Sequence, residues 1–163
     1  MRVGQDDGCF QPFHACIDNA IHWAAGPRLR EDCGRIMAVQ RHPEATGLAK
    51  ITRACNLPSR FVLDTVGPIV RGPLTDAHRR DLARCYRSCL EVAAEVGSIR
   101  TLAFCAISTG VFGFPKLPAA DIAINTVAEW MHERPNAFSK VIFNVFSDDD
   151  RAAYTVAWTR RTS

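Results

Sequence analysis

The sequence lacks any long apolar run. No segment approaches about 18 uninterrupted apolar residues, the length typical of a membrane-spanning helix, and the N-terminus has no apolar signal-peptide core. Both absences argue against a membrane partner and against secretion. We therefore expect a cytoplasmic protein.

The sequence also lacks a strong excess of one charge. Its 20 basic and 17 acidic residues leave a formal net charge of only +3, and the arginines are scattered rather than gathered into a stripe. This balance argues against a nucleic-acid partner.

Repeats and low-complexity tracts are absent, and a disulfide framework is not expected. Seven cysteines are an odd number, in a chain of 163 residues without a secretory signal. Five of them fall in helix or strand patterns, as small core residues do: Cys33, Cys55, Cys85, Cys89 and Cys105. Length and a hydrophobic content of 47% are those of one globular domain.

The hydrophobic periodicity predicts alternating helices and strands. Helices are expected at Ile17–Ala25, Arg28–Gln40, Thr75 to about Val96, Pro118 to about Glu133, and Asp148–Thr159. Strands are expected at Ala49–Leu57, Arg60–Val66, Thr101–Ile107 and Lys140–Phe146. This alternation indicates an α/β sandwich with a largely parallel or mixed sheet. Because Thr101–Ile107 is apolar on both faces, we expect a central strand with helices on each side.

Two cysteines and a histidine crowd the segment before the first helix. Cys9, His14 and Cys16 lie within eight residues, and thiolates with an imidazole suit zinc. Three protein ligands would leave one position open for water or substrate. The spacing matches no zinc finger. An equally open interpretation is that the segment holds two buried free cysteines and a solvent-facing histidine, and no metal.

Asp18 and His22 lie one turn apart at the start of the first helix. A carboxylate in a first turn is favourable for structural reasons alone, because it complements the helix dipole. The functional alternative is a base or an orienting group near the metal. A single helix histidine is more often structural than a ligand.

A loop with two glycines leaves the Thr101–Ile107 strand and leads into a helix. Ligands of open α/β sheets bind beyond the carboxyl ends of strands, where glycines let backbone N–H groups approach an anion. Phe112 and Phe114 would offer stacking surface to a sugar or a base. An ordinary tight connection is the alternative.

Three of these segments resemble the macrodomain family. Ile107–Pro115 (ISTGVFGFP) resembles its diphosphate-binding loop, and Cys16–Gly26 (CIDNAIHWAAG) its loop-to-helix segment, with Asp18 at the functionally important aspartate. Phe61–Pro68 (FVLDTVGP) resembles a strand that normally has histidine at the place of Asp64.

The segment Gly8–Cys16 resembles the zinc-binding variant of that loop, found in microbial macrodomains that remove ADP-ribose from proteins. The resemblance implies that Cys9, His14 and Cys16 hold Zn²⁺ and that Asp18 orients or deprotonates the attacking water. It also implies a set of residues that contact diphosphate and distal ribose: Ser108, Thr109, Gly110, Val111, Phe112, Gly113 and Phe114. Asn19 and Asn144 are candidates for ribose and adenosine contacts.

The resemblance implies a macrodomain-like three-layer α/β/α sandwich with a mixed sheet over residues 9–163, with residues 1–8 unstructured or unmatched. The family's N-terminal strands and helix have no counterpart in Met1–Gly8, so we expect an N-terminally truncated domain with either exposed apolar sheet edges or another strand pairing. The implied function is zinc-dependent mono-ADP-ribosyl hydrolysis on ADP-ribosylated protein or ADP-ribose. The alternatives are a non-catalytic ADP-ribose-binding module and an inactive fragment.

Overall fold

A computed structural model describes residues 16–163. Five helices and four strands alternate along this part of the chain. In order they are α1 (Ile17–Ala25), α2 (Pro27–Gln40), β1 (Ala49–Arg53), β2 (Phe61–Thr65), α3 (Asp76–Glu95), β3 (Thr101–Phe104), α4 (Lys116–Glu133), β4 (Lys140–Phe143) and α5 (Asp148–Thr162). The prediction of an α/β fold, with each element in the expected place, is confirmed.

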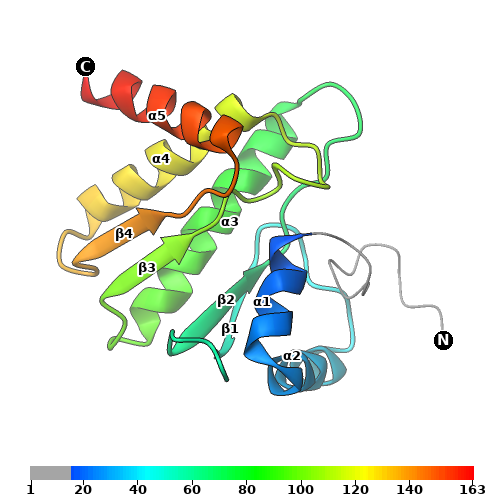
Figure 1. The fold of residues 1–163 in the computed structure, drawn as a ribbon. Coiled ribbons are helices and arrows are strands. Elements are labelled where there is room, and N and C mark those ends of the chain that lie inside the picture. The colour runs from blue at the N-terminus through cyan, green and yellow to red at the C-terminus, as the bar shows by residue number, and fades with distance from the viewer. Residues whose placement is uncertain (1–15) are drawn as a thin grey trace.

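The described strands pair in two separate ladders. β1 and β2 are antiparallel, with Lys50 opposite Asp64, and β3 and β4 are parallel, with Phe104 opposite Phe143. The pairing is therefore mixed, as expected. Within residues 16–163, no ladder joins β2 to β3, although the two strands run through the same part of the molecule (Figure 1). Each strand thus has one edge without a partner among the described residues.

The prediction that Thr101–Ile107 is covered on both faces is wrong. The strand ends at Phe104, and exposure alternates along it: Leu102 and Phe104 are buried whereas Thr101 and Ala103 are exposed. One face packs on the core and the other does not, so the apolar run reflects a short strand followed by a partly buried loop.

Helix α3 forms much of the core. Thr75 caps it, because its Oγ1 accepts from His78 N at 3.3 Å while the His78 side chain accepts from Thr75 N. Its expected stripe is buried at Leu82, Cys85, Tyr86 and Cys89. Leu82, Tyr86 and Cys89 share one cluster with residues of β3, α4 and α5, including Phe104, Trp130 and Tyr154.

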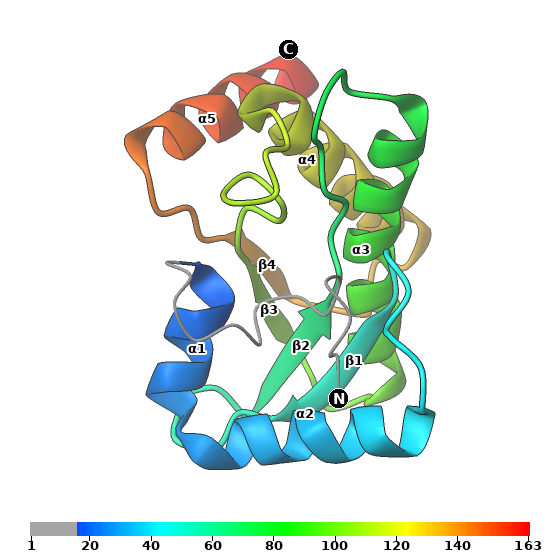
Figure 2. The same cartoon turned by 90° about the vertical axis from the view of Figure 1, so that its right-hand side faces the viewer.

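The helices lie on both sides of the strands. α1 and α3 lie on opposite sides of β2, and α4 and α5 pack together beyond β3 and β4 (Figures 1 and 2). This gives the layers of the predicted α/β/α arrangement. Predicted element boundaries differ slightly: α4 begins at Lys116 rather than Pro118, and β1, β2 and β4 end before their predicted ends.

No helix in the described part of the chain is long and apolar enough to cross a membrane.

Candidate functional site

Helix α1 places Asp18 and His22 on one face, directed at the interior. Asp18 Oδ1 lies 3.6 Å from His22 Nε2, and the spacing of four residues puts one side chain above the other. His22 is buried and Asp18 is half-buried. Burial raises the pKa of Asp18, against the opposing charges of His22 and Arg30. Burial likewise lowers the pKa of His22, which Asp18 opposes.

Two further polar side chains, those of Cys33 and Asp64, lie in the same region. Cys33 of α2 lies with its Sγ 4.0 Å from Oδ2 of Asp64, on β2. Burial, followed by the charge of Asp18, raises the pKa of Asp64 to about 6. Asp18 therefore faces β2 from α1, with Cys33 and Asp64 in its electrostatic neighbourhood.

The loop after β3 presents free backbone donors. Within it, Phe114 N donates to Ser108 O at 2.9 Å and Gly113 N donates to Gly110 O at 3.0 Å. The N–H groups of Gly110, Val111 and Phe112 donate to no group within residues 16–163. A tight loop with consecutive unused N–H groups is the geometry that receives a phosphate or another anion.

Ser108 is the strained residue of this loop. Its φ of 64° lies in the left-handed region, and its Oγ is buried without a hydrogen-bond partner among the described residues. The loop is held against the segment after β2, where Val70 N donates to Phe112 O at 2.8 Å. A Cβ on Gly67 would lie 2.1 Å from Ser108 Oγ, so the close approach requires glycine there.

Asp18 and this loop belong to one region of the molecule. The charge of Asp18 contributes to the raised pKa of Cys105, whose first cause is burial, and Cys105 lies three residues before Ser108. The face of α1 that carries Asp18 is therefore close to the carboxyl end of β3. The structure thus places a carboxylate with a raised pKa near a loop whose N–H groups at Gly110, Val111 and Phe112 have no acceptor within residues 16–163.

The other predicted ligand-binding residues differ in how far they are exposed. Phe114 is only 1% exposed and belongs to the core, so the expectation that its ring offers stacking surface is wrong. The loop turns at Gly113 (φ 69°) and directs that ring inward. Phe112 is half-buried, Asn19 is half-buried on α1, and Asn144 is exposed after β4, where its N–H donates to Phe104 O at 2.7 Å.

Of the predicted metal ligands, Cys9 and His14 lie outside the described residues. Cys16 is half-buried at the N-cap of α1, and its side chain makes no capping hydrogen bond. The prediction that Met1–Gly8 is unstructured or unmatched also falls outside the described residues.

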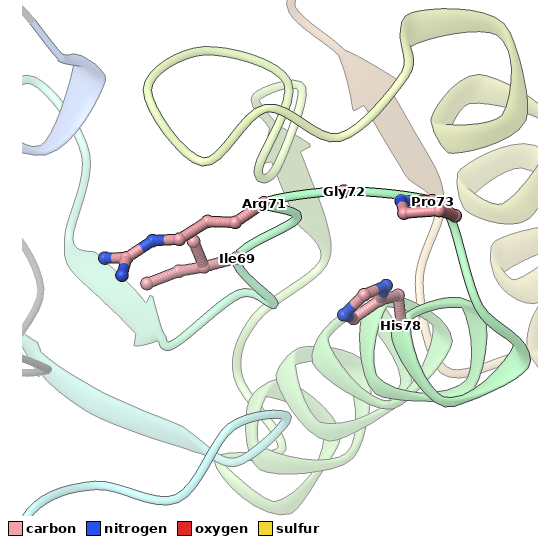
Figure 3. Close-up of a pocket in the computed structure, with 5 residues that line it drawn as sticks. All are labelled: Ile69, Arg71, Gly72, Pro73 and His78. Atoms are coloured by element: carbon pink, nitrogen blue, oxygen red, sulfur yellow. The ribbon is translucent and has the colours of Figure 1, made fainter.

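A hollow of about 460 Å³ lies between the segment after β2 and the start of α3. It is lined by Ile69, Arg71, Gly72, Pro73 and His78, and the Arg71 side chain extends away from the His78 ring (Figure 3). None of the predicted site residues lines it. The neighbouring residue Val70 connects this hollow to the site, because its N–H donates to Phe112 O in the loop after β3.

Comparison with known proteins identifies this arrangement. The sequence matches the Macro domain family over residues 9–123, which include α1, β2 and the loop after β3. The chain belongs to the macrodomain family.

Relatives and solved structures agree with that assignment. Two relatives named protein-ADP-ribose hydrolase share 55% identity over 147 residues in Treponema medium and 47% over 154 residues in Staphylococcus aureus. The alignments cover 90% and 94% of this macrodomain but 56% and 57% of the relatives, so the chain spans little more than half their length. An Oceanobacillus iheyensis macrodomain with ADP has a TM-score of 0.83 at 34% identity, covering 91% of this chain and 77% of that one.

Sequence reasoning missed the Cys33–Asp64 neighbourhood of the macrodomain. It treated Cys33 as a core residue and noted Asp64 only as a departure from the usual histidine. One signal was available: Asp64 interrupts the apolar strand Phe61–Thr65 with an ionisable side chain. Pairing it with Cys33, 31 positions away, requires the fold.

Proposed function

We propose that this macrodomain hydrolyses the bond between ADP-ribose and a modified protein. The observation that supports the proposal is that Asp18 lies near enough to Cys105, just after β3, for its charge to raise the pKa of that thiol, and the loop Ser108–Phe114 begins three residues later. The names of the relatives at 55% and 47% identity support the same reaction. The loop N–H groups would receive the diphosphate, and Asp18 would lie toward the distal ribose.

Within this proposal, Cys9, His14 and Cys16 hold Zn²⁺. Two thiolates and an imidazole are a donor set that fits zinc, and Cys16 has a side chain not used in capping. When bound, the metal supplies Lewis acidity and a template for a ribose hydroxyl or water. Cys16 lies two residues before Asp18, so this site and the carboxylate would face the same part of the substrate.

Asp18 then acts on the attacking water. Its half-buried carboxylate has a raised pKa, so it accepts a proton more readily than an exposed aspartate while remaining close to an imidazole that orients it. The water adds to the anomeric carbon of the distal ribose, the bond to the protein side chain breaks, and the leaving side chain takes up a proton. ADP-ribose and unmodified protein are the products.

The decisive experiment compares hydrolysis with binding in the same variant. Asp18→Asn keeps the size of the side chain and removes the base, so we expect the hydrolysis rate on an ADP-ribosylated protein to fall about 10²- to 10⁴-fold. Calorimetry should show ADP-ribose affinity within a few fold of wild type. Cys9→Ala with Cys16→Ala should also lower the rate, while Cys55→Ser serves as a matched cysteine control.

Three results would redirect the proposal. Undiminished hydrolysis in Asp18→Asn would remove Asp18 from the mechanism, and undiminished hydrolysis in the double cysteine variant would remove zinc. Binding of ADP-ribose by metal-replete wild type without turnover would instead identify a binding module. Neither binding nor turnover would leave an inactive fragment.

A further inference from the structure

Three side chains with metal-binding chemistry converge from three different elements. They are His22 of α1, Cys33 of α2 and Asp64 of β2, and their donor atoms all lie within 4.8 Å of one another. His22 is buried and the other two are half-buried. The cluster shares no residue with the donor set Cys9, His14 and Cys16, and of its three members the proposed hydrolase mechanism uses only His22, as the imidazole that orients Asp18.

The dimensions of the cluster are close to those of a zinc site. Zinc bonds of 2.0–2.3 Å in a tetrahedron place ligand atoms about 3.3–3.8 Å apart. Cys33 Sγ and Asp64 Oδ2 are already 4.0 Å apart, and no donor pair exceeds 4.8 Å. Side-chain rotations that move each donor atom by about 1 Å would complete the geometry. Three ligands would leave the fourth position to water.

The charges around the cluster favour a cation. Burial and then the carboxylates of Asp64, Asp18 and Asp32 raise the pKa of Cys33 to about 12, against the smaller opposing effect of the Arg30 cation. Acidic groups thus crowd a thiol in a partly desolvated space, where a divalent cation would offset their repulsion and hold the thiolate form.

Asp18 supplies the partner that a zinc-bound histidine usually has. Its Oδ1 lies 3.6 Å from His22 Nε2, and a carboxylate in this position would fix the orientation of a metal-binding imidazole ring. His22 follows Cys16 by six residues, a rise of about 9 Å along a helix, so the cluster lies more than one helical turn from the Cys16 donor.

We propose that His22, Cys33 and Asp64 form a second zinc-binding site between α1, α2 and β2. The mixed nitrogen, sulfur and oxygen donors select zinc, and its cobalt substitute, over calcium or magnesium, which prefer oxygen ligands. The site would join three elements that come from separate parts of the sequence. Its existence does not depend on the hydrolase proposal.

The test uses the full chain carrying Cys9→Ala and Cys16→Ala, so that the first donor set is removed. Metal-free protein is titrated with Co²⁺ and then with Zn²⁺, while absorption is recorded. We expect one Co²⁺ per chain, a sulfur-to-cobalt charge-transfer band with the visible bands of tetrahedral cobalt, and loss of all of them on adding Zn²⁺.

Variants in that background assign the ligands. Cys33→Ser should abolish the sulfur-to-cobalt band, and Asp64→Asn should weaken Zn²⁺ binding at least tenfold. The matched control is Cys55→Ser, since Cys55 is also half-buried but bonds to Arg53 O at 3.7 Å outside the cluster; it should keep the band.

The proposal is overturned if the background protein shows no sulfur-to-cobalt band, or if the band persists in Cys33→Ser. Should Cys33→Ser fail to fold, Asp64→Asn decides the matter through the melting temperature. Zn²⁺ should raise it in the background protein and raise it clearly less in Asp64→Asn, and an equal rise in both would refute the site. Hydrolysis plays no part in these readouts, so this proposal and the hydrolase proposal can fail separately.

Discussion

Asp64→Asn should make the metal-free protein more stable at pH 8, although it removes a hydrogen-bonded carboxylate. Burial, followed by the charge of Asp18, raises the pKa of Asp64 from the usual 3.8 to about 6. Because the folded form binds the proton more tightly than the unfolded chain, this carboxyl favours folding below about pH 4. That contribution is lost as the pH rises through about 6.

The pKa values of Asp64 in the folded and unfolded chain differ by about 2, which corresponds to about 3 kcal/mol. This is the upper limit of the destabilisation that the ionised carboxylate causes at pH 8. An asparagine resembles the protonated acid at every pH. We therefore expect Asp64→Asn to raise the free energy of unfolding by up to about 3 kcal/mol at pH 8 and by little at pH 4.

Urea unfolding with a chelator present, at several pH values between 4 and 8, measures this difference. Asp149→Asn is the control, because it makes the same chemical change at an exposed position and should shift stability by no more than about 1 kcal/mol. A gain for Asp64→Asn that does not grow with pH would refute the electrostatic reasoning. So would a loss at pH 8.

Two further substitutions test the loop and the last helix. Gly67→Ala should lower ADP-ribose affinity at least tenfold in calorimetry, because its Cβ would lie 2.1 Å from Ser108 Oγ and displace the loop; unchanged affinity would show that the loop adapts or does not bind. Ser147→Ala should lower the free energy of unfolding by about 1 kcal/mol in urea, because its Oγ caps α5 by accepting from Asp150 N at 3.1 Å. Thr155→Ala, an exposed change inside the same helix, should cost less; an equal loss would contradict the capping role.

The fold was predictable wherever local pattern decides it. Thr75 and the stripe Leu82–Cys89 define α3 because a cap and a helical period are both properties of neighbouring residues. The extent of β3 was not predictable in the same way. Whether Thr101 and Ala103 are covered depends on which elements pack on that face, and no local pattern carries this information.

The same distinction between local pattern and tertiary packing applies to the candidate site. Asp18 and the loop at Ser108–Phe114 were found through motifs, since each is a contiguous segment. The direction of the Phe114 ring could not be predicted from the motif, because it depends on the turn at Gly113. The neighbourhood of Cys33 and Asp64 was missed because residues on α2 and β2 meet only through tertiary packing.

The cluster of His22, Cys33 and Asp64 between α1, α2 and β2 is difficult to explain by packing alone. β2 is otherwise built from apolar and β-branched side chains, and valine or leucine at position 64 would be free of the ionisation penalty that Asp64 carries. His22 and Cys33 likewise occupy inward positions on amphipathic helices, where leucine would serve the core equally well. Three ionisable groups with perturbed pKa values, gathered from three elements beside a candidate catalytic carboxylate, are typical of a functional site. A metal explains their combination because it needs the donor atoms that make each residue costly to bury.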